Sequence, residues 1–293
     1  MSRVYLHSKN NVDSLIKVML YLFIPFALYG FYKNGIKLYA NDYISIFSMI
    51  KSLLFIGISV LVSYIFSKLN KEKFISFTLL SNIMIALIAS PSLSIIFYLI
   101  GIIVLNGIQK LVKFNIVPVF MVITIIVDLI LKNPIFLNVF ESSVDYNYSL
   151  FDFLIGKGPG GTGNTLMAMS IVSLIVLILN INYKKQIPIM AFTSYYILAI
   201  ITSFVTGTLD QSLLLNNNVI FSFIFLSNVS IYTPYSKGAC YIYGLALGML
   251  TYLSYFINID LGVYLVLTIL SFVYPLLDRF IVGKNDKHLI EVL

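Results

Sequence analysis

The sequence has 293 residues and few charged ones, since only 11% are Asp, Glu, Lys or Arg. A soluble domain of this length carries roughly 25% charged residues. So small a charged fraction cannot cover a water-facing surface of ordinary polarity. The composition therefore excludes an ordinary soluble globular protein.

Cysteine and histidine are almost absent. Cys240 is the only cysteine, which excludes a disulfide within the chain and a cysteine-ligated cluster. The two histidines, His7 and His288, lie near the two ends of the sequence, so no haem, zinc or other metal site is expected. No residues with a pattern typical of acid-base catalysis are identified either.

Hydrophobic residues, by contrast, make up 59% of the chain, and the mean hydropathy is +0.96. They form repeated apolar segments long enough to cross the ~30 Å hydrocarbon core of a bilayer. Lipid offers no hydrogen-bond partners, so such segments must satisfy their backbone groups internally, as helices. The sequence predicts an all-α polytopic membrane protein of about ten transmembrane helices in the lipid bilayer. The predicted spans are residues 14–32, 43–67, 74–90, 93–109, 117–131, 165–183, 187–206, 218–231, 239–257 and 261–278.

Two of these spans, 117–131 and 218–231, are short. Short spans are typical of transporters and channels, in which helices are tilted or broken around a site. We therefore expect either span to be tilted, broken or half-buried.

The basic residues of the loops predict the orientation of the chain. One side holds thirteen Lys and Arg residues, Lys184 and Lys185 among them, and the other side holds Lys33, Lys37, Lys132 and Lys157. Because cytoplasmic loops carry the excess of positive charge, both termini are predicted in the cytoplasm and the long loop 132–164 outside. The net charge of +7 is spread over short loops, so no nucleic-acid partner is expected.

A weak internal repeat occurs at a spacing of 143 residues. Two halves with an odd number of spans each would have opposite orientations, and inverted repeats place functional sites between them. We predict two inverted five-helix halves, residues 1–131 and 165–293, joined by the extracytoplasmic loop 132–164. The alternative is that the identities arise by chance. The recurring residues are Pro91 as Pro234, Tyr98 as Tyr241, Gly101 as Gly244, and Asn115-Ile116 as Asn258-Ile259.

Loop 132–164 leads into a glycine-rich segment, residues 156–165, directly before an apolar span. Clustered glycines allow close backbone approach, Asn164 or Thr165 can cap the next helix, and a helix N-terminus suits a phosphate. One interpretation is a phosphate-bearing ligand; the other is an ordinary tight turn with a good cap. The segment is not a P-loop, because no Gly-Lys-Ser/Thr follows at the required place. The candidate ligand-binding residues are Gly156, Gly158, Gly160, Gly161, Thr162, Gly163, Asn164 and Thr165.

The glycine-rich segment resembles one in the RnfD/NqrB family, whose members are membrane subunits of the ion-pumping Rnf and Nqr electron-transport complexes. The family has Gly-x-x-Pro-Gly-x-x-Gly-Glu-Thr here, and Asn164 stands where the family has the acid. Residues 225–234 resemble the family's Phe-Met-Ala-Thr-Asp-Pro-x-Thr-Ser-Pro, with Val229 at the aspartate. Residues 113–118 and 275–278 also resemble family segments. The matching residues of the glycine-rich segment are Gly156, Pro159, Gly160, Gly163 and Thr165.

The resemblance implies ten helices in two inverted halves, similar to urea channels, in a bacterial cell membrane. It also implies other Rnf/Nqr-type membrane subunits as partners and flavin mononucleotide (FMN) or riboflavin as a cofactor. Typical members carry FMN covalently on a threonine upstream of the glycine-rich segment. Residues 142–150 contain no threonine, so a flavin here is expected to be held without a covalent bond.

Four polar residues outside this segment are further site candidates. Asp128 lies inside a predicted span, where a carboxylate is costly and often functional, but an interfacial structural role is equally expected near the span's outer end. Asp210 lies in an outer loop and matches a family aspartate, although a solvated turn is the simpler interpretation. Asn115 and Asn258, related by the repeat, either face each other at the centre or cap broken helices. Asp278 is expected to pair with its neighbour Arg279.

The leading hypothesis is a membrane subunit of an Rnf/Nqr-type complex, taking part in transmembrane electron transfer coupled to Na⁺ or H⁺ movement. The redox step would belong to a cofactor or a partner subunit. The rival is a non-redox transporter or channel for a small neutral solute or a vitamin on the same scaffold, which the missing flavin threonine favours. A purely structural subunit is a third alternative, because a fold does not settle a function.

Overall fold

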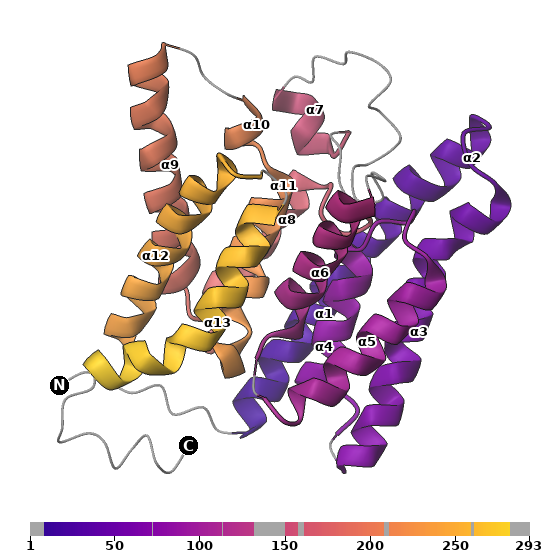
Figure 1. Ribbon diagram of the computed structural model, residues 1–293, viewed down its shortest axis with the longest axis horizontal. Coiled ribbons are helices and arrows are strands. Elements are labelled where there is room, and N and C mark those ends of the chain that lie inside the picture. Colours follow the sequence, from indigo (N-terminus) through magenta and orange to yellow (C-terminus); the bar gives the residue numbers. More distant parts are fainter. Residues whose placement is uncertain are drawn as a thin grey trace. The chain divides into compact units, whose positions relative to one another are not determined.

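The computed structural model describes residues 9–71, 73–112, 114–131, 150–157, 161–207, 211–258 and 261–281. Every regular element in these ranges is a helix, which confirms the all-α prediction (Figure 1). The chain divides into two compact units, residues 13–177 and residues 178–293 together with 1–12. The predicted halves, 1–131 and 165–293, stay a prediction.

In its described residues, the unit of residues 13–177 contains all or most of nine helical elements. They are α1 (Lys9–Phe31), η1 (Tyr32–Lys37), α2 (Leu38–Ala40), α3 (Ile46–Asn70), α4 (Phe77–Ile88), α5 (Ile95–Gln109), α6 (Ile116–Leu131), α7 (Leu150–Ile155) and α8 (Met167–Leu179). Helix α3 packs along α4 and α5, and α6 packs against α4 and α5 (Figure 1). Ser45 begins α3 as its N-cap, because its hydroxyl accepts a hydrogen bond from Ser48 N at 3.3 Å.

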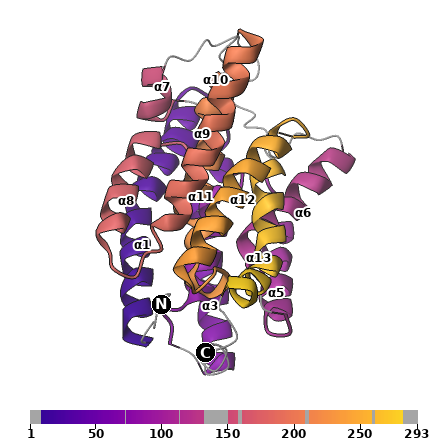
Figure 2. The ribbon, with the colours of Figure 1, turned by 90° about the vertical axis from the view of Figure 1, so that its left-hand side faces the viewer.

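The unit of residues 178–293 contains the remaining elements. They are α9 (Gln186–Thr206), α10 (Gln211–Leu214), α11 (Asn217–Ile224), η2 (Leu226–Asn228), η3 (Ser230–Tyr232), α12 (Lys237–Tyr255) and α13 (Leu261–Ile281). Helix α12 lies beside α9 and also contacts α13 (Figure 2). Ser236 caps α12, and its hydroxyl accepts from Ala239 N at 3.1 Å.

Two glycines one helical turn apart allow α12 to approach α9 closely. A Cβ on Gly244 would lie 2.6 Å from the carbonyl O of Ile187, and one on Gly248 would lie 2.2 Å from the carbonyl O of Ala191. Glycines spaced in this way are typical of membrane helix pairs, whose association depends on close packing because lipid is as apolar as the side chains.

Each predicted span contains a helix, but several helices are shorter than expected. Within the described ranges, four helical stretches are long and apolar enough to cross a membrane, namely Val12–Ala40, Ile46–Asn70, Gln186–Thr206 and Leu261–Phe280. The predicted span 74–90 is helical only over the 12 residues of α4. The span 218–231 breaks after the 8 residues of α11, as the sequence suggested, whereas 117–131 is the unbroken helix α6.

Helix α1 continues further than the sequence predicted. Lys33 and Lys37, placed in an outer loop by the sequence, lie instead on the π-helical turn η1, which joins α1 to α2. Wide turns of this kind mark local departures from regular helix geometry. The apolar helix therefore extends to Ala40.

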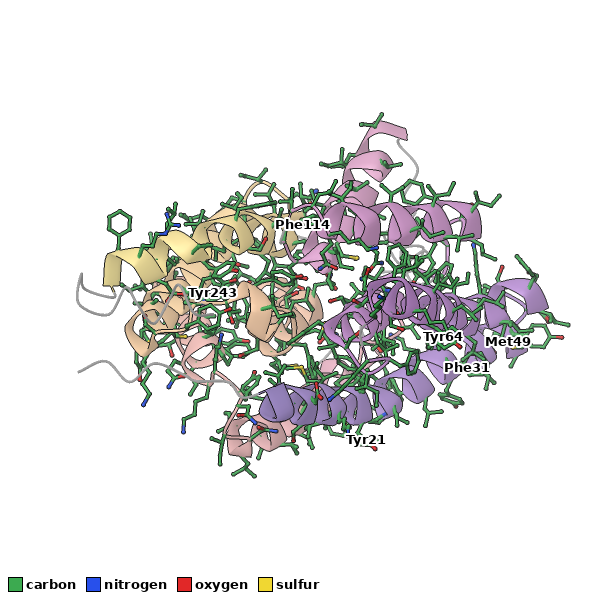
Figure 3. The ribbon with its side chains drawn as sticks, turned by 90° about the horizontal axis from the view of Figure 1, so that it is seen from below. Tyr21, Phe31, Met49, Tyr64, Phe114 and Tyr243 are labelled. Atoms are coloured by element: carbon green, nitrogen blue, oxygen red, sulfur yellow. The ribbon has the colours of Figure 1, made fainter. Side chains whose placement is uncertain are left out.

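Large apolar side chains face outward from the helices. Phe204 of α9 and Phe280 of α13 are 85% and 86% exposed. Figure 3 shows Tyr21 on the outer side of α1, whereas Tyr243 of α12 lies inside its unit. An apolar surface of this extent is unfavourable in water and is expected where helices face lipid.

The two units share an order of helices. Helices α3, α4, α5 and α6 begin at residues 46, 77, 95 and 116, and α9, α11, α12 and α13 begin at 186, 217, 237 and 261, so the pairs are 140–145 residues apart. The environments of the repeated residues differ, however. Tyr98 is fully buried in α5, whereas Tyr241 of α12 is 47% exposed.

Candidate functional site

Residues 161–165 of the glycine-rich segment are buried against the end of α4. The N–H of Gly163 donates to the carbonyl O of Leu87 at 2.6 Å. A Cβ on Gly161 would lie 2.5 Å from the carbonyl O of Ile88, and one on Gly163 would lie 2.5 Å from Leu87 Cβ. Both positions therefore require glycine, because atoms of α4 lie where a Cβ would be.

Helix α1 approaches the same segment at Gly30. A Cβ on Gly30 would lie only 1.6 Å from the carbonyl O of Thr162. Thr162 is 1% exposed, and its hydroxyl has no hydrogen-bond partner within the part of the chain that the structure describes. Burying a hydroxyl without a partner costs free energy, so this oxygen is suited to a water molecule or another small polar group.

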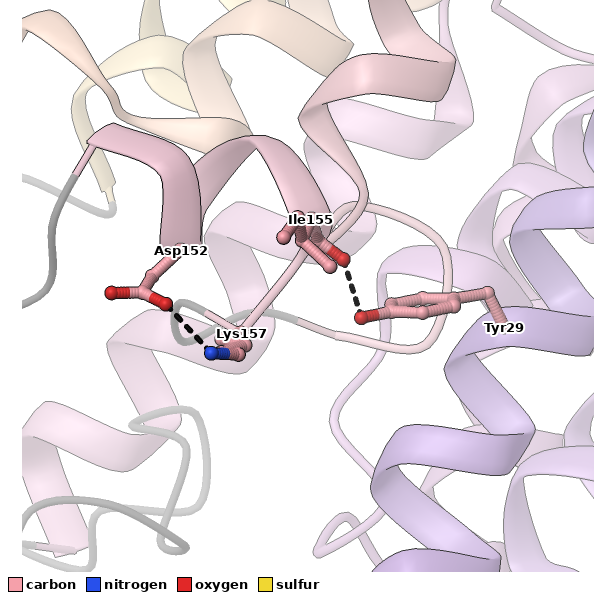
Figure 4. A network of polar contacts seen from close by, with 4 residues as sticks. All are labelled: Tyr29, Asp152, Ile155 and Lys157. Atoms are coloured by element: carbon pink, nitrogen blue, oxygen red, sulfur yellow. Dashed lines mark hydrogen bonds and ion pairs between the residues drawn. The ribbon is translucent and has the colours of Figure 1, made fainter.

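The start of the glycine-rich segment is held by α1 and α7 (Figure 4). Gly156 has a φ of 87°, in the left-handed region that favours glycine. The hydroxyl of Tyr29 donates to the carbonyl O of Ile155. Lys157 pairs with Asp152 at 2.8 Å, and this hydrogen bond and the charge of Asp152 raise the pKa of Lys157. The lysine of the segment is thus already engaged with a carboxylate.

The described glycines of the segment lie in close contact with the protein. Gly161 and Gly163 face α4 and not an open space. Helix α8 begins at Met167, so Asn164 and Thr165 are buried ahead of its first turn. Gly158, Pro159 and Gly160 lie outside the described residues. The ligand-binding role of residues 156–165 stays a prediction.

Asn115 and Asn258 each cap the helix that follows. The Asn115 side-chain oxygen accepts from Val117 N at 3.2 Å at the start of α6. The Asn258 side-chain oxygen accepts from Leu261 N at 2.9 Å at the start of α13. Both asparagines therefore cap the start of a helix, and they do so at corresponding positions of the predicted repeat.

The two aspartate candidates are less well defined. Asp128 lies in the last turn of α6, near the end of the helix as the sequence suggested, and its side chain lies outside the described part. Asp210 also lies outside the described residues. Neither prediction is tested.

A network of uncharged polar side chains joins α3, α4 and α5. The Ser59 hydroxyl donates to the carbonyl O of Asn82 at 2.9 Å and lies 2.7 Å from the Tyr98 hydroxyl. The Asn82 amide donates to Ser63 at 2.9 Å, and the Asn106 amide donates to Asn82 Oδ1 at 2.9 Å. All five residues are buried. Such bonds between membrane helices add stability.

The unit 178–293 contains a buried cation that the sequence did not single out. Lys184, in the loop before α9, is fully buried. Its ammonium donates to the hydroxyl of Thr233 at 2.6 Å and to the Thr233 carbonyl O at 3.2 Å, and it lies 5.0 Å from the ring centre of Tyr235. The Asn228 side chain holds the backbone of the same residue: its Oδ1 accepts from the Lys184 N–H at 3.1 Å, and its Nδ2 donates to the Lys184 carbonyl O at 3.3 Å.

Asp278 does not pair with Arg279, contrary to the expectation from the sequence. Within the described ranges, no ion pair joins the two residues. The buried carboxylate of Asp278 instead accepts hydrogen bonds from Tyr235 N at 2.9 and 3.1 Å and from Ser236 N at 3.1 Å. These N–H groups precede α12, so Asp278 stabilises the start of that helix.

Nothing in the sequence marks Lys184 as different from Lys185, which is exposed. The sequence places both among the cytoplasmic basic residues. The difference arises only from the fold, which buries one of two adjacent lysines at the turn into α9. Among the described residues, no group of three or more His, Cys, Asp or Glu could hold a metal ion.

Comparison with known protein families identifies a matching family. The model of the NQR2, RnfD, RnfE family matches residues 118–287, more than half of the chain. The matched region includes the described part of the glycine-rich segment, the broken helix after α11, and Lys184. No curated protein matches the sequence.

Proposed function

Because the chain belongs to the NQR2, RnfD, RnfE family, we propose that it is an integral membrane subunit of an Rnf/Nqr-type complex. In that role it takes part in electron transfer across the membrane coupled to ion movement. The observation that carries this proposal is the family match over residues 118–287. The outward-facing apolar side chains and the four long apolar helices support the membrane location.

The proposed topology has ten membrane segments in two inverted halves, with both termini in the cytoplasm of a bacterial cell. The shared order of helices in the two units supports a duplication. The corresponding caps at Asn115 and Asn258 support it independently, because the same residue type starts the last helix of each half. Five segments per half give the halves opposite orientations.

We further propose that a flavin, FMN or riboflavin, is held by this chain without a covalent bond. A flavin supplies electron transfer when it is bound. The absence of threonine from residues 142–150 supports attachment without a covalent bond.

Mass spectrometry of the chain tests the cofactor proposal directly. Protein purified in mild detergent is expected to show a flavin absorption band that moves to the supernatant when the denatured protein is precipitated, and the denatured chain is expected to have its unmodified mass. A mass increase corresponding to FMN on the denatured chain would contradict the non-covalent proposal.

Ion uptake by inverted membrane vesicles tests the function. Vesicles from cells that lack this chain are expected to lose Na⁺ or H⁺ uptake driven by electron transport, and a restored wild-type copy is expected to return it. Uptake that is unchanged in the deletion strain would contradict the proposal. Vesicles with an added ionophore provide the control for passive leakage.

A second candidate function is a channel or transporter for a small neutral solute. The uncharged network of Ser59, Ser63, Asn82, Tyr98 and Asn106 favours it, because buried amides and hydroxyls suit a neutral polar molecule. Solute flux into liposomes that contain only this chain would support this candidate. Liposomes impermeable to such solutes would contradict this candidate.

A further inference from the structure

The irregular backbone between α11 and α12, residues 225–236, is referred to as the broken segment. Side chains from other parts of the sequence hold this segment at both ends. Lys184 donates to Thr233, and the Tyr183 hydroxyl donates to the carbonyl O of Ile224, just before the segment, at 2.8 Å. From α13, Asp278 accepts from the backbone N–H of Tyr235. A helix break near lipid persists only where its free backbone groups find such partners.

The charge of Lys184 is costly in this place. The residue is fully buried, and burial lowers the pKa of its ammonium from 10.5 to about 8, although the nearby Cys240 and Asp278 favour the charged form. Burial disfavours a charged group because it loses its hydration. Lys185, the next residue, is exposed and shows that the loop can bring a lysine side chain to water.

Thr233 accommodates Lys184 in both protonation states. A protonated ammonium donates to the carbonyl O and to the hydroxyl of Thr233. A neutral amine still donates to the carbonyl O and can accept a hydrogen bond from the hydroxyl, because a hydroxyl is both donor and acceptor. The proton can therefore leave without breaking the contact between Lys184 and the broken segment.

We propose that Lys184 is a proton-binding site whose charge sets how firmly the broken segment is closed. Proton loss removes the cost of a buried charge and favours the closed arrangement, in which Lys184 contacts Thr233. Proton uptake favours an open arrangement in which the ammonium reaches water. The inference stands beside the proposed function and does not depend on electron transfer.

The direction of the pH effect follows from the two pKa values. In the open arrangement the pKa of Lys184 returns to 10.5, whereas in the closed arrangement it is about 8. Between these values the open form binds more protons, so raising the pH favours the closed form. The ratio of open to closed protein is expected to fall about tenfold from pH 7 to pH 9.

Several tyrosines adjoin Lys184 or the broken segment, namely Tyr183 beside Lys184, Tyr232 within the segment and Tyr274 of α13. Further ionisable groups face Lys184 or the segment. They are Cys240 from α12, Asp278 from α13, and Tyr235 of the segment itself. Burial raises the pKa of Tyr235 above its usual value, so this phenol stays neutral from pH 7 to 9. A Cys240→Ala variant removes the thiol and serves as a control for its titration.

Hydrogen–deuterium exchange of the full chain in lipid nanodiscs tests the proposal. Peptides that cover residues 225–236 are followed from pH 7 to 9, with rates corrected for the intrinsic effect of pH on exchange. The protection of these amides is expected to increase about tenfold over this range in the wild type. The variants Lys185→Met and Cys240→Ala are expected to keep this increase.

Two variants of Lys184 separate charge from shape. Lys184→Met has no charge and is expected to show protection that does not change with pH. Lys184→Arg stays charged throughout and is expected to remain at the low protection of the wild type at pH 7, also without pH dependence. Constant protection in the wild type, or an unchanged pH dependence in either variant, would overturn the proposal.

Discussion

At the scale of single residues, the contact between α1 and the glycine-rich segment allows no side chain at Gly30. A Cβ there would lie 1.6 Å from the carbonyl O of Thr162. Gly30→Ala is therefore expected to lower the free energy of unfolding by about 2 kcal/mol or more, because the backbones must separate. Thermal unfolding in detergent measures the effect.

The matched control for this variant is Gly57→Ala. Gly57 lies on the exposed side of α3, and a Cβ there would have nothing within 4 Å. Alanine favours a helix over glycine by about 1 kcal/mol, so this variant is expected to be neutral or slightly stabilised. Equal losses in both variants would refute the close contact at Gly30.

Asp278 provides a second prediction at this scale. Its carboxylate accepts from Tyr235 N and Ser236 N at the start of α12. Asp278→Asn replaces one acceptor oxygen with a donor and removes the charge, so a loss of about 2 kcal/mol in unfolding free energy is expected. The exposed neighbour gives the control, Arg279→Gln, which should unfold like the wild type if the two residues are not paired.

The sequence and the structure differ most at single residues. Asp278 beside Arg279 suggested a local ion pair, and Lys184 beside Lys185 suggested two solvated charges. In both cases the partners come from 40 or more residues away, at Tyr235 and Thr233. Because the fold brings these distant residues together, the local spacing of residue types does not reveal such contacts.

At the scale of elements, the pairing of α9 with α12 depends on Gly248. A Cβ there would lie 2.0 Å from Ser194 Oγ and 2.2 Å from the carbonyl O of Ala191. Gly248→Ala is expected to push the helices apart and to cost about 2 kcal/mol of stability. Gly107→Ala in α5, which meets nothing within 4 Å, is the control. Equal melting temperatures for the two variants would show that the helices do not pack as described.

The hydrophobic pattern predicted where helices occur better than where they end. Each predicted span contains a helix because apolar length is a strong signal. The ends depend on contacts that the pattern does not show. Helix α1 passes through η1 to Ala40 although Lys33 and Lys37 suggested a loop, and α11 ends at Ile224, where Tyr183 accounts for the freed carbonyl O.

The glycine-rich segment shows how far local sequence can predict a site. The clustering of its glycines correctly predicted positions of close backbone approach. The groups that approach Gly161 and Gly163 are the Ile88 carbonyl and the Leu87 side chain, while the ligand-binding role of the segment stays a prediction. Composition alone cannot distinguish these two uses of glycine, because both need the same absence of a side chain.

At the scale of the whole molecule, the proposed inverted halves predict the side of the membrane for each loop. Reporter enzymes fused after the last residue and at Lys157 are expected to report the cytoplasm and the outside, respectively, because loop 132–164 is proposed to be extracytoplasmic. A fusion at Lys110 serves as a second cytoplasmic reference. The same side for Lys157 and Lys110 would refute five segments per half.

The membership of a larger assembly is tested most directly by native mass spectrometry of the affinity-tagged chain, solubilised from its own membranes. We predict a stable complex in which this chain is bound to other Rnf/Nqr-type membrane subunits. A solubilised chain that is found without bound partners, or bound only to copies of itself, would contradict the account.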